Sequence, residues 1–448
     1  MRIILPEDVK NIIECLNNCG HEAYAVGGCV RDSVLGKTPS DWDITTSAKP
    51  EEVKDIFPKT FDTGIEHGTV TVLMNHVGYE VTTYRIDGEY EDGRHPKQVE
   101  FTASLEEDLK RRDFTINAMA YNEKEGIIDL FGGLDDLNRG IIKCVGEPEE
   151  RFGEDALRML RALRFAAQLD FDIDSKTYEA IEKLAPTIEK VSKERIMVEL
   201  VKTLVSDHPD KMRVVSQCGL GKYFLPELDV MFATSQNNIH HCYTVGEHTM
   251  HALLAVPNDK VLRLTMLLHD VGKPVAKTTD ENGVDHFKMH PQIGADMAVN
   301  ILRRLKFDND TIARVKRLVL WHDDRPAMNE KSVRKAIVRF SEAAFPDIFA
   351  VKRADAMAQS EVGRQEKLDY IDEFQRIYED IMAKGQCVSK KTMVVNGKDI
   401  LELGAPQGKM VGDVLDELFK EVVSNSDLND REYLLNEARR IIGNYGGK

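Results

Sequence analysis

A pair of glycines followed by two closely spaced acids constrains this chain more than any other feature. The stretch runs Gly27-Gly28-Cys29-Val30-Arg31-Asp32 and continues to Asp41-Trp42-Asp43. We expect a turn, a short helix and then a strand that ends in the two acids. Because strand side chains alternate between faces, Asp41 and Asp43 would point the same way. Two neighbouring carboxylates repel each other unless a cation lies between them, and Mg²⁺ prefers such oxygen ligands.

The residues that precede the acids suit a phosphate group. The Gly27-Gly28 turn lets backbone N–H groups approach a phosphate, and the guanidinium of Arg31 adds a planar fork of donors. Asp32 completes the motif. The alternative is an ordinary glycine loop beside a solvated Asp-x-Asp turn. Because the glycine motif stands directly ahead of the acids, we favour a site that binds a metal–triphosphate and transfers a nucleotidyl group.

Length, charge and cysteine content set the broad class of protein. At 448 residues the chain is too long for one hydrophobic core, and roughly three or four domains are expected. A net charge of −16 means that a nucleic-acid partner would need a local basic cleft. The cysteines are scattered without a C-x-x-C pair, and no apolar run approaches the ~20 residues of a membrane span. We therefore expect a cytoplasmic protein with reduced thiols and no membrane partner.

Short strands dominate the first 145 residues. The runs 69–74 and 79–85 alternate in hydrophobicity, which predicts a hairpin. Glu80 on its second strand would supply a third carboxylate near the acid pair, although a surface glutamate fits the spacing equally well. The segment 86–98, rich in glycine and charge, is predicted to be a mobile loop.

A second group of polar residues follows between positions 109 and 120. Arg112, Asp113 and Asn117 would set phosphate-binding donors beside groups able to bond a ribose hydroxyl. A plain helix start capped by Asp113 is the alternative.

Beyond residue 145 the pattern is helical almost to the end, and the segment 154–165 is its most informative helix. Asp155, Arg158 and Arg161 are three apart and would share one face. Asp155 could accept from the exocyclic amino group of cytosine or adenine while Arg158 donates to the adjacent ring nitrogen. Guanine and uracil present the opposite polarity there, so this pair would select C and A. Arg161 and Arg164 remain for phosphate or for orienting the pair; surface ion pairing is the alternative.

Together these motifs resemble the bacterial (class II) tRNA nucleotidyltransferase and poly(A) polymerase family. The matching motifs are the Gly-Gly-x-Val-Arg-Asp run, the acid pair, Arg111-Arg112-Asp113-Phe114-Thr115-Ile116-Asn117-Ala118, Glu154-Asp155-x-x-Arg158 and Lys193-Glu194-Arg195-Ile196 with Glu199. The resemblance implies an α+β fold with a polymerase-β-like nucleotidyltransferase head, followed by an all-α neck, body and tail. In that family, residues that match the acid pair bind magnesium. The incoming ATP or CTP is bound there by residues that match Gly28, Arg31, Arg112, Asp155, Arg158, Arg161 and Arg164.

The family contains enzymes with different products. CCA-adding members keep a flexible loop after the second catalytic strand, here 86–98, and CC-adding relatives have it shortened. Poly(A) polymerases usually carry a basic C-terminal extension, whereas residues 427–448 are mixed in charge. We therefore predict untemplated addition of CCA to the tRNA 3′ end from CTP and ATP, with two-magnesium catalysis and Glu80 as a helper. CC addition and poly(A) synthesis are the alternatives.

Histidines and aspartates in the second half of the chain form another candidate site. They are His248, His269, Asp270, His290, His322 and Asp355. Such residues on successive helices can converge on a metal ion. For any single histidine, an ordinary core or surface residue is the alternative. The adjacent His269-Asp270 pair next to an apolar run is harder to explain without a partner, because burying it unpaired is costly.

This set resembles the HD phosphohydrolase superfamily over about residues 240–360. There, residues matching His248, His269, Asp270 and Asp355 bind a divalent transition metal, and those matching His290 and His322 bind a second metal in some members. There are two rival interpretations. One is a phosphohydrolase whose main activity lies at this site, and the other is a catalytically silent nucleotide sensor. The predicted domains are a head (1–145), a neck and body for base selection and RNA binding (146–235), an HD domain (236–360) and a tail (361–448). The oligomeric state is not predictable from these patterns.

Overall fold

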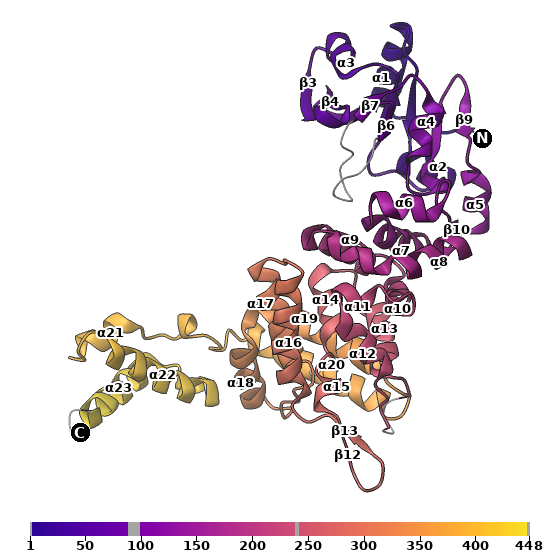
Figure 1. The fold of residues 1–448 in the computed structure, drawn as a ribbon. Coiled ribbons are helices and arrows are strands. Elements are labelled where there is room, and N and C mark those ends of the chain that lie inside the picture. Colours follow the sequence, from indigo (N-terminus) through magenta and orange to yellow (C-terminus); the bar gives the residue numbers. More distant parts are fainter. Residues whose placement is uncertain (1, 88–98, 238–241, 446–448) are drawn as a thin grey trace. The chain divides into compact units, whose positions relative to one another are not determined.

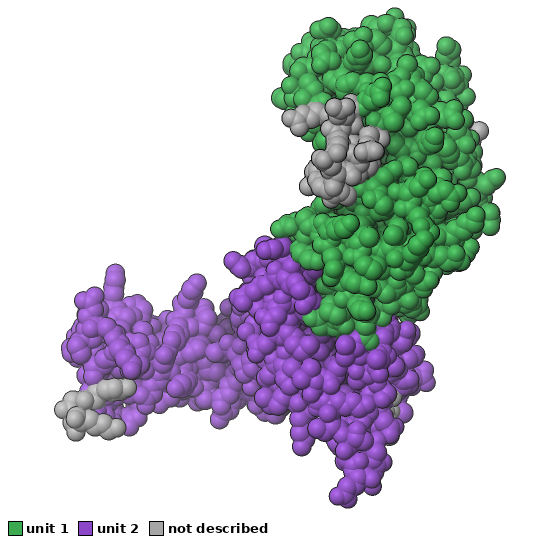
Figure 2. All heavy atoms as spheres, in the orientation of Figure 1, with its two compact units in different colours: residues 1–229 green, residues 230–448 purple. Residues whose placement is uncertain are grey.

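The computed structural model describes residues 2–87, 99–237 and 242–445. The chain divides into two compact units, residues 1–229 and 230–448, which are coloured separately in Figure 2. All seven cysteines are free. Within the described ranges, no helix has the length and apolar character needed to cross a membrane.

A seven-stranded mixed sheet forms the first part of unit 1 (Figure 1). Its strand order is β3-β4-β5-β2-β1-β8-β9. The strands are β1 (Ala23–Val26), β2 (Ile44–Thr46), β3 (Thr60–Gly64), β4 (Thr69–Met74), β5 (Val77–Thr83), β8 (Met119–Asn122) and β9 (Gly126–Asp129). β4 and β5 pair antiparallel, which confirms the predicted hairpin, and β5 pairs parallel with β2. β6 (Arg85–Asp87) pairs with β7 (Val99–Phe101), and the predicted loop lies largely outside the described residues.

Short helices complete this head and bring its loops together. They are α1 (Glu7–Asn18), α2 (Gly28–Val34), α3 (Pro50–Ile56), α4 (Leu105–Lys110) and α5 (Gly133–Arg139), together with the 3₁₀ helix η2 (Thr115–Asn117). Tyr24, Tyr84 and Leu109 are fully or almost fully buried and join β1 and α4 in one core cluster. Because α2 begins directly after β1, the glycine turn lies at the end of a central strand.

The remainder of unit 1 is helical. Its longer helices are α6 (Pro148–Glu154), α7 (Leu157–Leu169), α8 (Ser175–Leu184) and α9 (Lys193–Leu204). Buried leucines at positions 157, 160 and 163 line the inner face of α7, which packs on α9. Beyond residue 145 the described chain contains only two-residue strands, such as β11 (Asp172–Ile173). The predicted fold class, a mixed-sheet head followed by a mostly helical remainder, is confirmed.

Unit 2 is a bundle of helices followed by three further helices. The bundle includes α13 (Val245–Ala255), α14 (Lys260–Leu268), α16 (His290–Arg304), α17 (Asn309–Trp321), α18 (Glu330–Phe340), α19 (Phe345–Ala358) and α20 (Arg364–Ala383). The last helices are α21 (Gly397–Glu402), α22 (Lys409–Ser424) and α23 (Arg431–Tyr445), with a core cluster of their own. Buried Arg334 on α18 donates to the Val423 carbonyl at 2.9 Å and so ties α22 to the bundle.

Candidate active site and metal centre

The glycine turn packs against the second group of polar residues. Gly27 has φ +80°, which favours glycine, and a Cβ there would lie 3.1 Å from Arg112 Nη1. The N–H of Gly27 donates to the Met119 carbonyl at 3.1 Å. This N–H therefore closes the turn instead of facing a phosphate, which corrects part of the expectation.

Arg31 links the two polar segments of the head. Its Nη1 donates to Asn117 Oδ1 at 2.6 Å, and its Nε donates to Asp32 Oδ1 at 2.8 Å. The amide of Asn117 in turn donates to Asp113 Oδ1 at 3.3 Å. Asp113 also accepts from the Phe114 N–H at 2.9 Å and caps no helix, so the alternative of a plain helix start is wrong. Arg31, Asp32, Asp113 and Asn117 form one hydrogen-bonded network.

The two acids precede a strand instead of ending one. β2 begins at Ile44, directly after Asp43, so the expectation of a strand that ends in the acids is wrong. Parallel pairing puts Ile44 opposite Val81, which sets Asp43 beside Glu80 on β5. Among the described residues, Asp41, Asp43 and Glu80 do not form a group whose ligand atoms all lie within 4.8 Å of one another, as two groups in unit 2 do.

The electrostatics around Asp43 fit a bound cation. Although the side chain reaches solvent, its pKa is raised by partial desolvation and by the negative charges of Asp41 and Glu80, against the opposing charge of Arg112. Together with Asp43, the carboxylates of Asp41 and Glu80 are a suitable oxygen donor set for Mg²⁺, whose charge would offset the repulsion at Asp43.

Asp155 does not lie on the predicted helix. α6 ends at Glu154, α7 begins at Leu157, and Asp155 between them has extended backbone angles. The expectation that Asp155, Arg158 and Arg161 share one helical face is therefore wrong. Asp155 instead accepts from both terminal nitrogens of Arg195 on α9, at 3.2 and 2.6 Å. The sequence pattern gave no sign of this partner, because the two residues are far apart in the chain.

The arginines of α7 each contact a carbonyl or an acid. Arg158 donates to the carbonyls of Arg151 and Arg111 at 3.0 and 3.2 Å and pairs with Glu154. Arg161 donates to Asp113 Oδ2 at 2.7 Å, which joins α7 to the head network. Burial alone would raise the pKa of Asp113, but the positive charges of Arg161 and Arg158 outweigh it and lower that pKa to about 2. Arg164 forms a buried ion pair with Glu199 at 3.1 Å.

In unit 2, all six predicted ligands converge. His248, His269 and Asp270 form one group, Asp270, His290 and His322 form a second, and the ligand atoms within each group lie within 4.8 Å of one another. Asp270 serves both: its Oδ2 lies 3.2 Å from His269 Nε2, and its Oδ1 lies 3.5 Å from His290 Nε2. Asp355 joins the first group, 3.0 Å from His248 Nε2.

The four histidines are oriented alike. Their Nδ1 atoms lie 2.7–3.3 Å from backbone carbonyls of Ala358, Met266, Phe287 and Val319. Because a carbonyl only accepts, each Nδ1 carries a proton and each ring directs its Nε2 into the cluster. This is the arrangement of metal-ligating histidines in proteins. The Nε2 atoms of His248 and His269 lie 3.2 Å apart, and Asp270 Oδ1 is buried without a hydrogen-bond donor, so a divalent cation suits the cluster.

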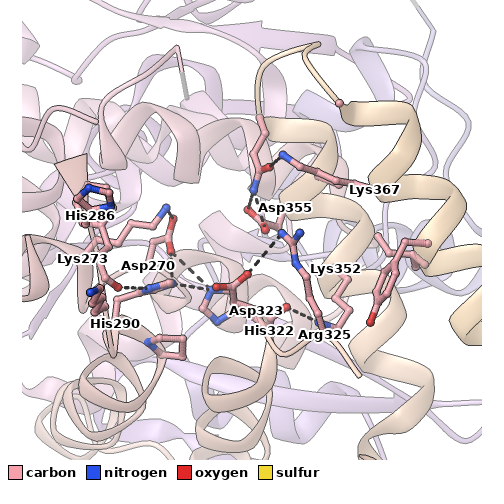
Figure 3. A pocket seen from close by; sticks show the side chains of 18 of the residues that line it. Asp270, Lys273, His286, His290, His322, Asp323, Arg325, Lys352, Asp355 and Lys367 are labelled. Atoms are coloured by element: carbon pink, nitrogen blue, oxygen red, sulfur yellow. Dashed lines mark hydrogen bonds and ion pairs between the residues drawn. The ribbon is translucent and has the colours of Figure 1, made fainter. Parts of the chain in front are cut away.

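An open cavity of about 700 Å³ lies over this cluster (Figure 3). Its wall carries both acids and cations, and the cations are Lys273, Lys288, Arg325, Lys352 and Lys367. Lys273 contacts Asp270 Oδ2 at 2.7 Å, and Gln359 donates to both oxygens of Asp355 at 3.0 Å. The pKa of Asp270 lies well below its ordinary value, because His269 and Lys273 outweigh the effect of burial. The cavity suits an anionic ligand placed against a metal.

Comparison with known proteins defines the class of the first unit. Family models match a "Poly A polymerase head domain" at residues 23–143, a "Probable RNA and SrmB- binding site of polymerase A" at 170–232 and tRNA nucleotidyltransferase domain 2 at 280–438. The head with its acids and arginine network is thus that of a nucleotidyltransferase with a polymerase-β-like fold.

Individual relatives narrow the class to one family. The CCA-adding enzyme of Ligilactobacillus salivarius is 37% identical over 98% of both chains, and that of Enterococcus faecalis is 55% identical over 45% of this chain and 50% of its own. The crystal structure of the Bacillus stearothermophilus CCA-adding enzyme in complex with CTP is 30% identical, covers 99% of this chain and 100% of its own, and has a TM-score of 0.73. The chain belongs to the CCA-adding tRNA nucleotidyltransferase family.

Proposed function

We propose that this protein adds C, C and A to the 3′ end of tRNA from CTP and ATP without a nucleic-acid template. The observation that carries the proposal is the continuous network from Arg31, just after the glycine turn, through Asn117 and Asp113 to Arg161 on α7. It joins the predicted triphosphate residues to the predicted base-selecting segment. The Bacillus stearothermophilus relative was solved with CTP, and a Thermotoga maritima CCA-adding enzyme of the same fold was solved with tRNA.

In this proposal the carboxylates of the head hold magnesium. Asp41 and Asp43 provide the ligands, and Glu80 beside Asp43 acts as a further ligand or base. Two Mg²⁺ ions held there would lower the pKa of the primer hydroxyl and stabilise the leaving pyrophosphate. The guanidinium groups of Arg31 and Arg112 hold the triphosphate and the sugar against the Gly27-Gly28 turn, with Asp113 and Asn117 orienting Arg31 and Arg161.

Base selection falls to Asp155 and Arg158 within the same proposal. A carboxylate has about four lone-pair positions, so Asp155 can accept from a base amino group while paired with Arg195. Arg161 and Arg164 complete the site. Helical segments after residue 145 would bind the tRNA through its shape and its phosphates. The proposal retains the four predicted domains and a cytoplasmic location. CC addition or poly(A) synthesis by the same head are the alternatives.

Substitution of Asp41 tests the head. We expect D41A to lower incorporation of CTP and ATP by at least about 10³-fold, since it removes a ligand of the reacting metal. D62A, which changes an exposed acid of β3 in the same sheet, is the matched control and should retain activity. Incorporation that survives D41A would refute the assignment of the head.

We also propose a second activity, a metal-dependent phosphohydrolase at the cluster of unit 2. The convergence of four histidine Nε2 atoms on Asp270 and Asp355, beneath a cavity with lysine and arginine side chains in its wall, supports it. When bound, a divalent transition metal supplies Lewis acidity toward a phosphoryl oxygen. Lys273 holds the shared carboxylate, and the cations of the wall bind the anionic substrate.

This second activity is tested with H269A. The variant should lose hydrolysis of a generic phosphomonoester in the presence of Mn²⁺ while keeping nucleotide incorporation. H251A is the matched control, because His251 lies on α13 but stacks on Tyr243 outside the cluster. No metal-dependent hydrolysis by the unaltered protein would refute this proposal and leave the first untouched.

A further inference from the structure

One aromatic ring contacts three of the arginines of the nucleotide site. Phe165 on α7 is 6% exposed. The guanidinium carbons of Arg164, Arg31 and Arg161 lie 4.1, 5.1 and 5.5 Å from its ring centroid. Arg31 belongs to α2 in the head, and the other two belong to α7, so the ring lies where these two elements meet.

Each of these guanidinium groups also has an acid at its edge. Arg31 pairs with Asp32 at 2.8 Å, Arg161 with Asp113 at 2.6 Å and Arg164 with Glu199 at 3.1 Å. An ion pair at the edge limits where a guanidinium can lie, and an aromatic ring beside it limits the tilt of its plane. The ring and the acids together define the orientation of all three groups.

Three cations around one buried side chain would ordinarily repel one another. The electron-rich face of an aromatic ring attracts cations, by roughly 0.5–2 kcal/mol for each contact, whereas an aliphatic side chain of similar volume does not. The ring is itself fixed by an edge-to-face contact with Phe114, at 5.8 Å between centroids and 81° between planes. Phe114 directly follows Asp113, the partner of Arg161, so one short segment holds both the ring and one arginine.

We propose that Phe165 is a positioning residue of the nucleotide site, whose ring aligns Arg31, Arg161 and Arg164 for the triphosphate and base of the incoming nucleotide. This inference rests on the proposed role of those arginines. An aromatic residue on the inner face of a helix would otherwise be only a core residue. The contacts with three guanidinium groups distinguish Phe165 from such a residue.

The test compares three full-length variants. F165L keeps an apolar side chain but loses the π face, F165Y keeps the ring, and F152L removes a ring that is 1% exposed in α6 of the same unit and has no cation over it among the described contacts. KM and kcat for CTP and ATP are measured on tRNA lacking CCA. The Kd of CTP with Mg²⁺ and the melting temperature are measured on the same samples.

We expect F165L to raise KM and Kd for both nucleotides about tenfold, with kcat changed less, because ground-state alignment of the arginines is lost. F165Y should stay within about twofold of the unaltered protein, and F152L should alter stability without altering KM. Three results would overturn the proposal. They are equal effects of F165L and F152L, an unchanged KM and Kd in F165L, and an F165Y variant as impaired as F165L. Absence of incorporation by the unaltered protein would instead refute the proposed function, and the Kd comparison would still decide the role of Phe165.

Discussion

Arg195 donates to both carboxylate oxygens of Asp155, through two nitrogens at 3.2 and 2.6 Å. Asp155 has no helical backbone to orient it, since it lies in the extended connection between α6 and α7. A bidentate pair of this kind fixes the plane of the carboxylate. The geometry of the proposed base selector therefore depends on α9 as well as on the segment that carries Asp155.

Substitution of Arg195 should lower base discrimination. We expect R195M to reduce the preference for CTP over UTP by about 10- to 100-fold, because an unconstrained carboxylate no longer meets the base at a defined angle. R195K keeps the charge but not the planar fork of donors, so its preference for CTP should lie between those of the unaltered protein and R195M. Ratios of kcat/KM for CTP and UTP on tRNA lacking CCA measure this; a ratio in R195M equal to that of the unaltered protein would contradict it.

Metal content should follow the sharing of Asp270. Its two oxygens face different histidine pairs, so D270N should bind no Mn²⁺ after dialysis, H290A should bind one ion and the unaltered protein two. Chelation should abolish hydrolysis at this site, and added Mg²⁺ alone should restore incorporation at the head. Elemental analysis of the dialysed proteins gives the stoichiometry, and a D270N variant that retains an ion would refute a shared ligand.

Asp113 should stabilise the protein with a characteristic dependence on pH. Its pKa is lowered to about 2 in the folded state, from an ordinary value of 3.8. A lowered carboxylate pKa stabilises the folded state above the unfolded pKa, and this contribution, about 2 kcal/mol, is lost as pH falls from about 4 to about 2.

Denaturant unfolding of D113N from pH 8 to pH 3 tests this sign. The difference in free energy of unfolding from the unaltered protein should stay constant down to pH 5 and shrink below pH 4. D135N, at an exposed position of α5, serves as the control and should show little effect. A difference that grows between pH 8 and pH 6 would indicate another titrating group.

Thiol reactivity should divide the cysteines into two sets. Cys15, Cys19 and Cys242 are exposed, whereas Cys29, Cys144, Cys218 and Cys387 are buried. Burial raises the pKa of Cys29 and Cys144 to about 12, so both remain protonated and unreactive at pH 8. Mass spectrometry after brief treatment with iodoacetamide should find three modified thiols in the native protein and seven in urea. Rapid modification of Cys29 in the native protein would be inconsistent with its burial.

Local pattern was enough to predict much of the head. The alternating β-branched residues of 69–83 specify a hairpin whose register is fixed by burial of one face. Alternation does not distinguish the start of a strand from its end, which is why the position of the acids relative to β2 was wrong. The helix predicted at 154–165 is interrupted at Asp155, whose carboxylate accepts from the Leu157 N–H at 3.0 Å and also pairs with the distant Arg195.

For the metal cluster and the arginine network as well, the sequence pattern shows the residue types but not their arrangement in space. The residue types of the six ligands were visible in the sequence, but the common orientation of the four histidines comes from backbone carbonyls. Phe165 was missed because an aromatic residue on an apolar helix face looks like any core residue. Only the folded structure brings Arg31 from α2 to the same ring as the arginines of α7.

Ordered incorporation from single nucleotides tests the central claim most directly. Three tRNA primers would be used, ending before CCA, after the first C and after both, each with one labelled nucleotide and Mg²⁺ as the only added metal. The account predicts C on the first two primers, a single A on the third, and no incorporation of G or U. Addition of C alone, or of a long A tract to any RNA, would contradict it.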